Sequence, residues 1–493
     1  MLLLGIDIGT SFIKVSVVDA ETQRAIATAQ YPDSENPITS LKPGWAEQSP
    51  EMWWEHTVAA IRNLNNSNKF NPKEISAIGI SYQMHGLVVV DKNQNVLRDS
   101  IIWCDSRAVT IGEGAYNSIG EETCSSCLLN SPGNFTASKL AWVKNNEPKT
   151  YSSISKIMLP GDFISMKLTG EITTTASALS EGILYDFKKN EVSSDVMKYF
   201  DFNYSLIPEI QPLFSSHGRI LPSVAQQLSL NEDVQVTYKA GDQLNNALSL
   251  NVLRPGEVAA TAGTSGVIFA VTDELFSDKY SRVNAFAHVN HTVTDRRLGV
   301  LLCINGTGII NSWIKKLCGD GLSYNEMNAI CSNIELGSNG LFILPFGNGA
   351  ERMLQNKIVG AHVDNIDLNK HTKAHIFRAV QEGIAFAFRY GLDIMKENNL
   401  NPTIIRAGKS NLFLSDVFVQ SFVNATGVTV ELYANDGSVG AALGASIGAG
   451  IYKTFEEAFS QFKVLKRVEP TEPEIFNQLY NEWKKLLDSR LPE

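Results

Sequence analysis

The sequence predicts an α/β protein built from two related halves, and three observations support that class. Residues 2–19, LLLGIDIGTSFIKVSVVD, are two apolar runs with a turn of small residues between them. A third alternating run, AIATAQY, follows, and after it come a helical pattern and an apolar strand pattern. Residues 257–273, EVAATAGTSGVIFAVTD, repeat the strand–turn–strand opening. A meander joined to helix and strand indicates a mixed sheet, and its return indicates an internal duplication.

The size and charge of the chain restrict its class. Its 493 residues are enough for two domains with full hydrophobic cores. The formal net charge of −10, without a long basic run, argues against nucleic acid and an anionic membrane as partners. No secretory signal pattern precedes Gly5, and residues 439–451 are too short and too rich in glycine to span a bilayer. We expect a cytoplasmic protein whose six cysteines are reduced thiols. A homodimer is left open.

The first elements follow the order strand, strand, strand, helix, strand. Residues 13–19 alternate between apolar and polar side chains, which predicts a half-buried strand. A helix is expected from Pro50, with Ser49 as its N-cap, because this pair is typical of a helix start. Two apolar strands, ISAIGIS and GLVVVD, follow, with YQMH between them, and DKNQN predicts a hairpin turn.

The rest of the first half predicts helices near SKLAWVKNN and GDFISMKLTG, with an irregular polar stretch, TGEITTTASALSEG, after them. DVQVTYKA predicts a strand, and GDQLNNALSLNVL predicts a helix that begins at Asp242. The sequence NVLRPGE breaks that helix. We therefore predict two domains, residues 1–251 and residues 252–493.

The second half begins with the repeated strand–turn–strand pattern. Residues 371–398 predict a long helix, because apolar residues such as Ile376 and Ile384 recur at helical spacing. PTIIRAGKSNLFLSDVFVQSFVNATG predicts a strand, a loop with glycine and a helix. EPEIFNQLYNEWKKLLDSR predicts a last helix that packs on the body of the protein.

Two Gly-Thr-Ser turns are candidates for contact with phosphate; they consist of Gly9, Thr10 and Ser11, and of Gly263, Thr264 and Ser265. Small residues let a backbone approach an anion, and backbone N–H groups and hydroxyls are donors. Each turn alone also fits an ordinary hairpin. Two related turns that face one cleft would hold phosphates from both sides. Lys14 either adds a positive charge beside the first turn or faces solvent as a strand lysine.

Two carboxylates are candidates for chemistry. Asp7 lies within an apolar strand, and a buried carboxylate is costly unless it is paired or works on a cation. We predict that it holds Mg²⁺ through water, and the alternative is a strand-end aspartate that accepts backbone hydrogen bonds. Asp242 lies at a strand-to-helix turn, where α/β sites gather, and is a candidate general base for a hydroxyl. Taken by itself, its position favours a helix N-cap.

Eight segments resemble the sugar kinases of the FGGY family. In order, they are GIDIGTSFIKV, PGWAEQSPEMWW, GISYQMHGLVVVD, IIWCDSR, FTASKLAWV, GDQLNNA, GTSGVIFAV and DGSVGAALGAS. The resemblance covers nearly the whole chain and is greatest to the xylulokinase group. It implies two actin-like (ribonuclease H-like) domains that close on ATP. The first domain would hold the sugar and the metal, and the second would hold the nucleotide.

The resemblance also implies roles for individual residues. Asp242 would be the catalytic base, and Asp7, through water, would organise Mg²⁺ together with Asp242. Both Gly-Thr-Ser turns would meet phosphate, with Lys14 beside the first. The sugar wall would consist of Gln83, Met84, His85, Gly86, Trp103, Asp105 and Gln243. The loop for adenosine would include Ala407, Gly408, Lys409 and Asn411. His85 is left open between a sugar contact and a histidine of the core.

Two segments depart from the family pattern. Gln243 stands where many xylulokinases have asparagine, and an amide longer by one carbon would change sugar choice. RAGKS, residues 406–410, stands where many relatives have a triple-glycine loop. Arg406 and Lys409 add bulk and charge to that loop.

We therefore expect ATP-dependent phosphorylation of the terminal hydroxyl of a ketopentose, with D-xylulose as the first candidate. The alternatives within the family are ribulose, erythritol and gluconate kinases. An alternative of another class is a non-catalytic, actin-like nucleotide-binding protein. Such a protein would need neither a base at Asp242 nor a polar sugar wall.

Overall fold

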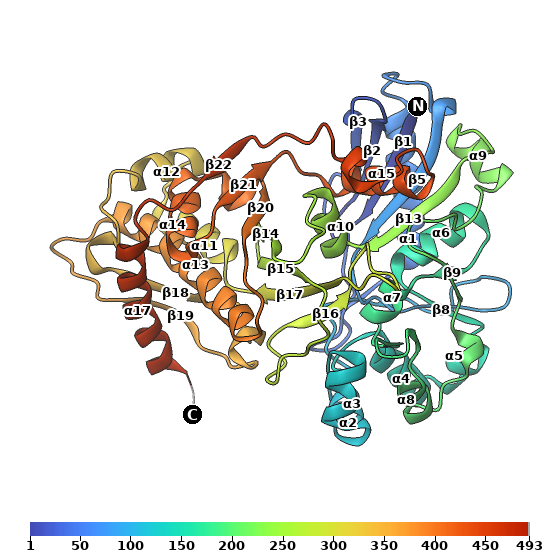
Figure 1. The fold of residues 1–493 in the computed structure, drawn as a ribbon, viewed down its shortest axis with the longest axis horizontal. Helices are drawn as coiled ribbons and strands as arrows, with labels where there is room; N and C mark the ends of the chain where they lie inside the picture. The colour runs from blue at the N-terminus through green and yellow to red at the C-terminus, as the bar shows by residue number, and fades with distance from the viewer. Residues whose placement is uncertain (492–493) are drawn as a thin grey trace.

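A five-stranded mixed sheet forms the centre of the first half of the computed structural model, which describes residues 1–491 (Figure 1). Its strand order is β13-β5-β1-β2-β3, with β1 at Leu2–Ile8, β2 at Ile13–Asp19, β3 at Arg24–Tyr31, β5 at Ile75–Tyr82 and β13 at Gln235–Gly241. β1, β2 and β3 form an antiparallel meander, and β5 lies parallel to both β1 and β13. The predicted meander and mixed sheet are confirmed.

The second half contains a seven-stranded sheet of order β16-β17-β15-β14-β20-β21-β22. Its strands are β14 at Glu257–Ala262, β15 at Gly266–Thr272, β16 at Asn284–Ala287, β17 at Leu298–Ile304, β20 at Ile404–Gly408, β21 at Val430–Tyr433 and β22 at Lys466–Val468. The central five, β21-β20-β14-β15-β17, repeat the order and the directions of the first sheet. The predicted duplication is therefore present in the topology, and β16 and β22 are additions at the two edges.

Helices cover one face of the first sheet. α1 (Pro50–Asn65) packs on β2 and β3, and α6 (Pro160–Thr169) packs on β5 and β13. Ser49 caps α1 as expected, because its side chain accepts a hydrogen bond from the Met52 amide. The other elements of this half are β4 (Glu47–Gln48), β6 (Val88–Val90), β7 (Ser100–Ile101), α2 (Val109–Ile119), α3 (Glu121–Thr123), α4 (Thr136–Asn146), α5 (Pro148–Ser153), β8 (Lys156–Met158), β9 (Thr173–Thr174), α7 (Ala176–Glu181), β10 (Tyr185–Asp186), β11 (Glu191–Val192), α8 (Ser194–Tyr199), β12 (Glu209–Ile210) and α9 (Pro222–Leu228).

A helix from the second half covers the other face of the first sheet. α15 (Gly437–Gly448) packs on β1, β2, β5 and β13 and contacts α10 (Asp242–Ser249) (Figure 1). It lies so close that a Cβ on Gly5 would be 1.7 Å from the Ser438 carbonyl oxygen, and one on Gly79 would be 1.9 Å from that of Ala441. Glycine in these two strands is therefore a packing requirement. This contact fixes the start of α15 beside β1.

α13 (Lys373–Glu397) packs on β15 and β17 of the second sheet, and α14 (Asp416–Thr426) packs on β22. The other elements of this half are α11 (Gly308–Cys318), α12 (Tyr324–Cys331), α16 (Phe455–Ala458), α17 (Pro473–Arg490) and a hairpin of β18 (Phe342–Phe346) and β19 (Gly360–Asp364). α13 is the predicted long helix, and the terminal α17 packs on α13, α14 and β18 as expected. A membrane-crossing helix is not found within residues 1–491.

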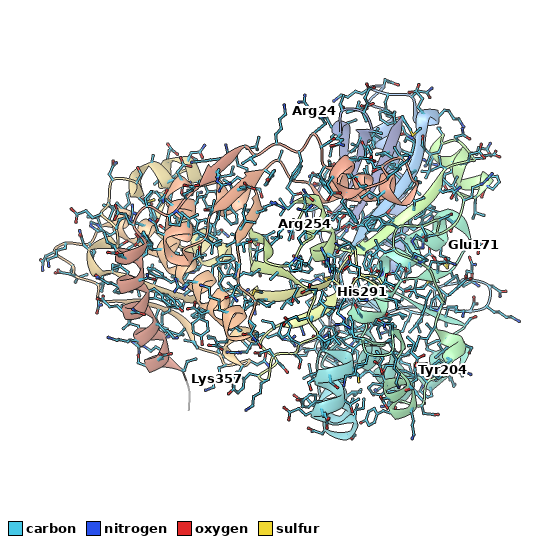
Figure 2. All side chains as sticks on the ribbon, in the orientation of Figure 1. Arg24, Glu171, Tyr204, Arg254, His291 and Lys357 are labelled. Atoms are coloured by element: carbon cyan, nitrogen blue, oxygen red, sulfur yellow. The ribbon has the colours of Figure 1, made fainter. Side chains whose placement is uncertain are left out.

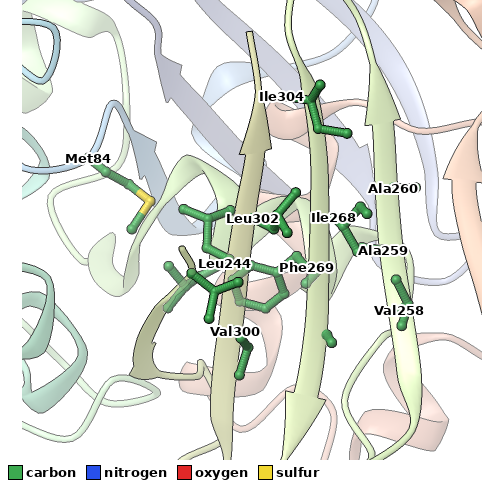
Figure 3. Packing of buried hydrophobic residues seen from close by; sticks show 14 of the residues in the cluster. Met84, Leu244, Val258, Ala259, Ala260, Ile268, Phe269, Val300, Leu302 and Ile304 are labelled. Carbon is green, nitrogen blue, oxygen red and sulfur yellow. The ribbon is translucent and has the colours of Figure 1, made fainter. Parts of the chain in front are cut away.

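The hydrophobic core of the second sheet continues into the first half. Met84 and Leu244 belong to the same buried cluster as Ile268, Phe269 and Leu302 of the second sheet. Figure 3 shows these side chains around strands of that sheet. The two halves therefore share apolar contacts at their junction.

One expectation for the first half is wrong. The stretch TGEITTTASALSEG, expected to be irregular, contains β9 and α7. Five of the six residues of α7 are buried, polar ones included. A helix buried on all sides carries no amphipathic period, and the sequence pattern missed it for that reason.

Candidate functional site

The first Gly-Thr-Ser turn closes the β1–β2 hairpin. The Gly9 amide donates to the Phe12 carbonyl oxygen at 3.0 Å, and a Cβ on Gly9 would lie 2.9 Å from that oxygen. Thr10 and Ser11 are half-buried. Lys14 forms an ion pair with Asp436, the N-cap of α15. Lys14 is therefore neither a lysine that only faces solvent nor free beside the turn, because it joins the first hairpin to the second half.

Asp7 lies on β1 with its carboxylate against the start of α15. A Cβ on Gly437 would be 2.3 Å from Asp7 Oδ2. Burial raises the pKa of Asp7, and the nearby charge of Asp436 adds to the rise. The nearby Ser81 side chain opposes the rise. The role in holding Mg²⁺ and the alternative of a strand-end aspartate both stay predictions.

Asp242 is the first residue of α10, directly after β13. Gly241 is the N-cap, and no side-chain cap bond is present at this described helix end. Burial raises the pKa of Asp242 to about 7, with the charge of Asp7 as the second cause, while hydrogen bonds from Gln243 oppose the rise. The two carboxylates therefore lie near enough to repel one another, at a point where each would gain from a cation.

Gln243 carries a hydrogen-bond acceptor without a partner beside Asp242. Its side chain hydrogen-bonds to Asp242, and its Oε1 is buried without a hydrogen-bond partner in the part of the chain that the structure describes. Such an atom is costly unless a ligand or water satisfies it. The residue that departs from the xylulokinase pattern therefore presents an unused oxygen next to the candidate base.

Glu181 is a site residue that sequence reasoning missed. It is fully buried at the end of α7, and a Cβ on Gly241 would lie 2.6 Å from its Oε1. The Tyr82 hydroxyl donates to Oε1 at 3.3 Å, while Oε2 has no partner among residues 1–491. Burial, and then the charge of Asp242, raise the pKa of Glu181 well above its ordinary range. Asp7 is the charged neighbour that raises the pKa of Asp242 after burial.

The QMHG segment, Gln83–Gly86, forms a turn next to α10. His85 has a left-handed backbone, with a φ of 62°. Its Nδ1 lies 3.1 Å from the Glu181 carbonyl oxygen, and its ring packs against Phe135 and Phe286. Burial lowers the pKa of His85 to about 3. These contacts favour the alternative of a core histidine for the ring, and they leave the backbone of the turn as the candidate sugar contact.

Lys139, on α4, hydrogen-bonds to the backbone of this turn. It is fully buried, and its Nζ donates to the carbonyl oxygens of His85 at 2.9 Å and Ile102 at 3.0 Å. Burial lowers the pKa of Lys139 to about 7, although Asp105 opposes the shift. The lysine therefore joins the QMHG turn to Ile102, the residue directly before the WCDSR segment, residues 103–107.

A hydrogen-bond chain connects the predicted sugar wall to the first hairpin. Trp103 Nε1 donates to Thr10 Oγ1 at 3.0 Å, and Thr10 Oγ1 donates to Gln83 Oε1 at 3.4 Å. Gln83 Nε2 donates to Gln48 Oε1 at 3.0 Å, and Gln48 Nε2 returns to the Thr10 carbonyl oxygen at 2.9 Å. Gln48 is a second residue that sequence reasoning missed. Trp103 is half-exposed, and its contact with a sugar stays a prediction.

Asp105 faces into the protein. Both of its carboxylate oxygens accept from Arg107, at 2.7–3.0 Å, and Oδ2 also accepts from the Ala46 amide at 2.6 Å. It is 1% exposed. This geometry gives Asp105 a positioning role for the WCDSR segment, and direct contact with a sugar stays a prediction.

The second Gly-Thr-Ser turn lies at the mouth of a cavity of about 430 Å³. Gly263, Thr264 and Asn411, all predicted for the nucleotide, line it. The turn is joined to the start of α11, because the Gly308 amide donates to the Gly263 carbonyl oxygen at 3.0 Å. Further lining residues that were not predicted are Gly308, Ile309, Asn311, Ser312, Tyr324, Asn325, Asn328, Leu412, Leu414 and Ser415. Gly308 belongs to the segment INGTG, whose glycines were a signal for this part of the cavity alone.

The charge of Arg406 in the RAGKS loop is paired within the protein. Arg406 forms ion pairs with Glu257 at 3.2 Å and Glu431 at 3.4 Å, and it also bonds the Asn251 carbonyl oxygen. The guanidinium charge of Arg406 is thus neutralised by carboxylates of the second sheet. Ser265, Ala407, Gly408 and Lys409 do not line the 430 Å³ cavity formed by described residues. Their contact with a nucleotide stays a prediction.

Two family models match the chain. The N-terminal domain of the FGGY family of carbohydrate kinases matches residues 2–249, and the C-terminal domain of the same family matches residues 258–451. The chain belongs to the FGGY family of carbohydrate kinases. The resemblance found in the sequence motifs is thereby confirmed, together with the two-part kinase fold.

The chain is similar to the xylulose kinase of Bacillus subtilis, which is 28% identical over 470 residues, 93% of this chain and 91% of the relative. A xylulose kinase from Brucella ovis has the same fold, with a TM-score of 0.88 at 24% identity and 99% of each chain covered. Plasmodium falciparum glycerol kinase with ADP also shares the fold, with a TM-score of 0.89 at 18% identity over 100% of this chain and 98% of that one.

Proposed function

We propose that this FGGY kinase transfers the γ-phosphoryl group of ATP to the terminal hydroxyl of a ketopentose, with D-xylulose as its substrate. The observation that carries the proposal is Asp242, a carboxylate at the end of β13 whose pKa is raised to about 7. A general base works best when its pKa is near the working pH. Full-length similarity to xylulose kinases supports the choice of sugar.

The residues present fit ATP and Mg²⁺. Asp7 and Asp242 repel one another, and hard carboxylate oxygens are the ligands that Mg²⁺ prefers, directly or through its waters. The 430 Å³ cavity has the size of a ligand site, with the Gly263–Thr264 turn at its edge for phosphate. When bound, the metal would neutralise charge on the phosphoryl oxygens.

The chain's own residues then have distinct tasks. The QMHG turn and Trp103 would orient the open-chain sugar, and Gln243 Oε1 would accept one of its hydroxyls. Asp242 takes the proton of the terminal hydroxyl as that oxygen forms its bond to the γ-phosphorus. The bond from phosphorus to the ADP oxygen breaks, and the first hairpin donates to the phosphoryl oxygens. Correct alignment of the two reactants is worth several kcal/mol.

A coupled ADP-release assay tests the proposal, with D-xylulose, D-ribulose, erythritol, glycerol and gluconate as acceptors. We expect D-xylulose to give the highest kcat/KM. Asp242→Asn should lower kcat by at least about 10²-fold, the low end for loss of a general base, with ATP binding retained. The matched control is Asp233→Asn, an exposed carboxylate paired with Arg219, and it should leave kcat unchanged. Slow ATP hydrolysis that no acceptor stimulates would instead favour a nucleotide-binding switch.

A further inference from the structure

Glu351 is a fully buried carboxylate of the second half that the proposed transfer does not use. Its Oε2 accepts from the Asn305 amide at 2.9 Å, and its Oε1 accepts from the Gly306 amide at 3.0 Å. Burial raises the pKa of Glu351 to about 7, and these two hydrogen bonds oppose the rise. A buried carboxylate is costly unless its oxygens are satisfied. The two amides that it binds therefore show what this carboxylate does in the fold.

The backbone around Glu351 is itself held in place. The Glu351 amide donates to the Lys357 carbonyl oxygen at 3.2 Å, and the Asn356 amide donates to the Glu351 carbonyl oxygen at 2.9 Å. Figure 2 labels Lys357 in the second half. Asn305 is also bound through its side chain, because its Nδ2 donates to the Ala350 carbonyl oxygen at 2.7 Å. The Glu351 carboxylate is thus a fixed support for the connection between β17 and α11.

That connection continues directly into the contacts that hold the second Gly-Thr-Ser turn. Thr307 is fully buried, and its Oγ1 lies 3.2 Å from the carbonyl oxygens of both Gly263 and Thr264. The Gly308 amide donates to the Gly263 carbonyl oxygen at 3.0 Å, and the Ile309 amide donates to that of Thr264 at 3.1 Å. A Cβ on Gly308 would lie 2.2 Å from the Gly263 carbonyl oxygen, so this contact is close-packed.

The second Gly-Thr-Ser turn consequently has occupied acceptors and free donors. In a trans peptide the amide hydrogen lies opposite the carbonyl oxygen, so the amides of Thr264 and Ser265 point away from the start of α11. Within residues 1–491, neither these two amides nor the two side-chain hydroxyls have a hydrogen-bond partner. Gly263 and Thr264 line the 430 Å³ cavity. Free amides and hydroxyls in one turn are the donors that an anion such as phosphate needs.

We propose that Glu351 is a positioning residue for the phosphates of the nucleotide and that it acts through Thr307. By binding the amides of Asn305 and Gly306, it places the Thr307 hydroxyl against the carbonyl oxygens of the second Gly-Thr-Ser turn and keeps the donors of that turn available. The inference rests on the proposed function, because it takes ATP and ADP as the ligands of this turn.

Isothermal titration with ADP in magnesium buffer tests the proposal on two variants. Glu351→Gln puts an amide group opposite one of two backbone amides, and Thr307→Val removes the hydroxyl at nearly constant volume. We expect each to raise the Kd for ADP about tenfold or more, since a buried group loses its hydrogen-bond partner. Initial rates, with the acceptor that the coupled assay selects, should show a raised KM for ATP and an unchanged KM for the sugar. Melting temperatures check that both variants are folded.

Two matched controls accompany these variants. Thr307→Ser keeps the hydroxyl and should bind ADP as the unchanged protein does. Glu335→Gln makes the same chemical change at an exposed glutamate of the same half and should also leave the Kd unchanged.

The titration needs no acceptor, so a wrong choice of sugar would leave its result unchanged. An unaltered Kd for ADP in a folded Thr307→Val variant would overturn the proposal. Equal losses in Thr307→Ser and Thr307→Val, an equal rise in both KM values, or no binding of ADP by the unchanged protein would overturn it as well.

Discussion

At the scale of single residues, Gln243 stands where the resemblance to xylulokinases leads us to expect asparagine. Its buried Oε1 has no hydrogen-bond partner within residues 1–491, and we propose that a sugar hydroxyl satisfies it. An unpaired buried acceptor costs about 1–3 kcal/mol. We expect Gln243→Asn to raise the KM for the sugar about tenfold or more and to leave the KM for ATP unchanged. Initial rates with each substrate varied in turn measure this, and an equal rise in both KM values would contradict it.

Lys139 gives a prediction about pH. The folded protein lowers the pKa of Lys139 to about 7, whereas the unfolded chain restores its ordinary value of about 10.4. Between these values the unfolded state binds one more proton, so raising the pH stabilises the folded state. The contribution of Lys139 to the free energy of unfolding then rises by up to about 1.4 kcal/mol per pH unit.

The test compares the protein with Lys139→Met by urea unfolding at pH 7, 8 and 9. The difference between the two free energies of unfolding should grow with pH in favour of lysine. A difference that is constant or that shrinks would show that Lys139 is charged in the folded protein.

At the scale of elements, the sequence predicted those with a clear period or turn chemistry. The meander, α1 with its Ser49 cap, and α13 are confirmed. α7 was missed because all its sides are buried, and Glu181 was missed with it. The small residues of α15 indicate close packing, but a one-dimensional pattern does not say that its partner is the sheet of the other half. Asp242 itself was predicted from the sequence, whereas the burial and the neighbouring carboxylate that raise its pKa were not.

The contact between α15 and the first sheet gives a stability prediction. A Cβ on Gly79 would lie 1.9 Å from the Ala441 carbonyl oxygen, so Gly79→Ala must push α15 away from β5. Overpacking of this kind costs about 1–3 kcal/mol, and more where backbone must move. The control is Gly114→Ala in α2, where the nearest atom to a Cβ is 3.5 Å away. That change should stabilise by up to about 1 kcal/mol. Urea unfolding measures both, and equal midpoints would contradict the packing argument.

At the scale of the whole molecule, the two halves depend on one another. Three hydrogen bonds join α10 to the segment at the start of α15. Asn245 Nδ2 donates to the Gly437 carbonyl oxygen at 2.8 Å. Ser249 Oγ donates to Asn435 Oδ1 at 2.5 Å, and Asn435 Nδ2 donates to Asn246 Oδ1 at 2.8 Å. Asn130 and Ser180 bond the backbone of the edge strand β16. Division at residue 251, which the sequence predicts, would therefore cut through a shared core.

The last prediction follows from that dependence. A fragment of residues 1–251 lacks α15, so the face of its sheet that carries Leu3, Gly5, Ala77 and Gly79 is uncovered. Exposed apolar surface of this kind promotes a fluctuating, dye-binding state. We expect the fragment alone to bind anilinonaphthalene sulfonate and to lack near-ultraviolet circular dichroism. Adding residues 252–493 should restore the signal, because that fragment brings α15. Cooperative unfolding of residues 1–251 alone, with native near-ultraviolet circular dichroism, would show that the first half is an independent folding unit and that α15 is dispensable to it.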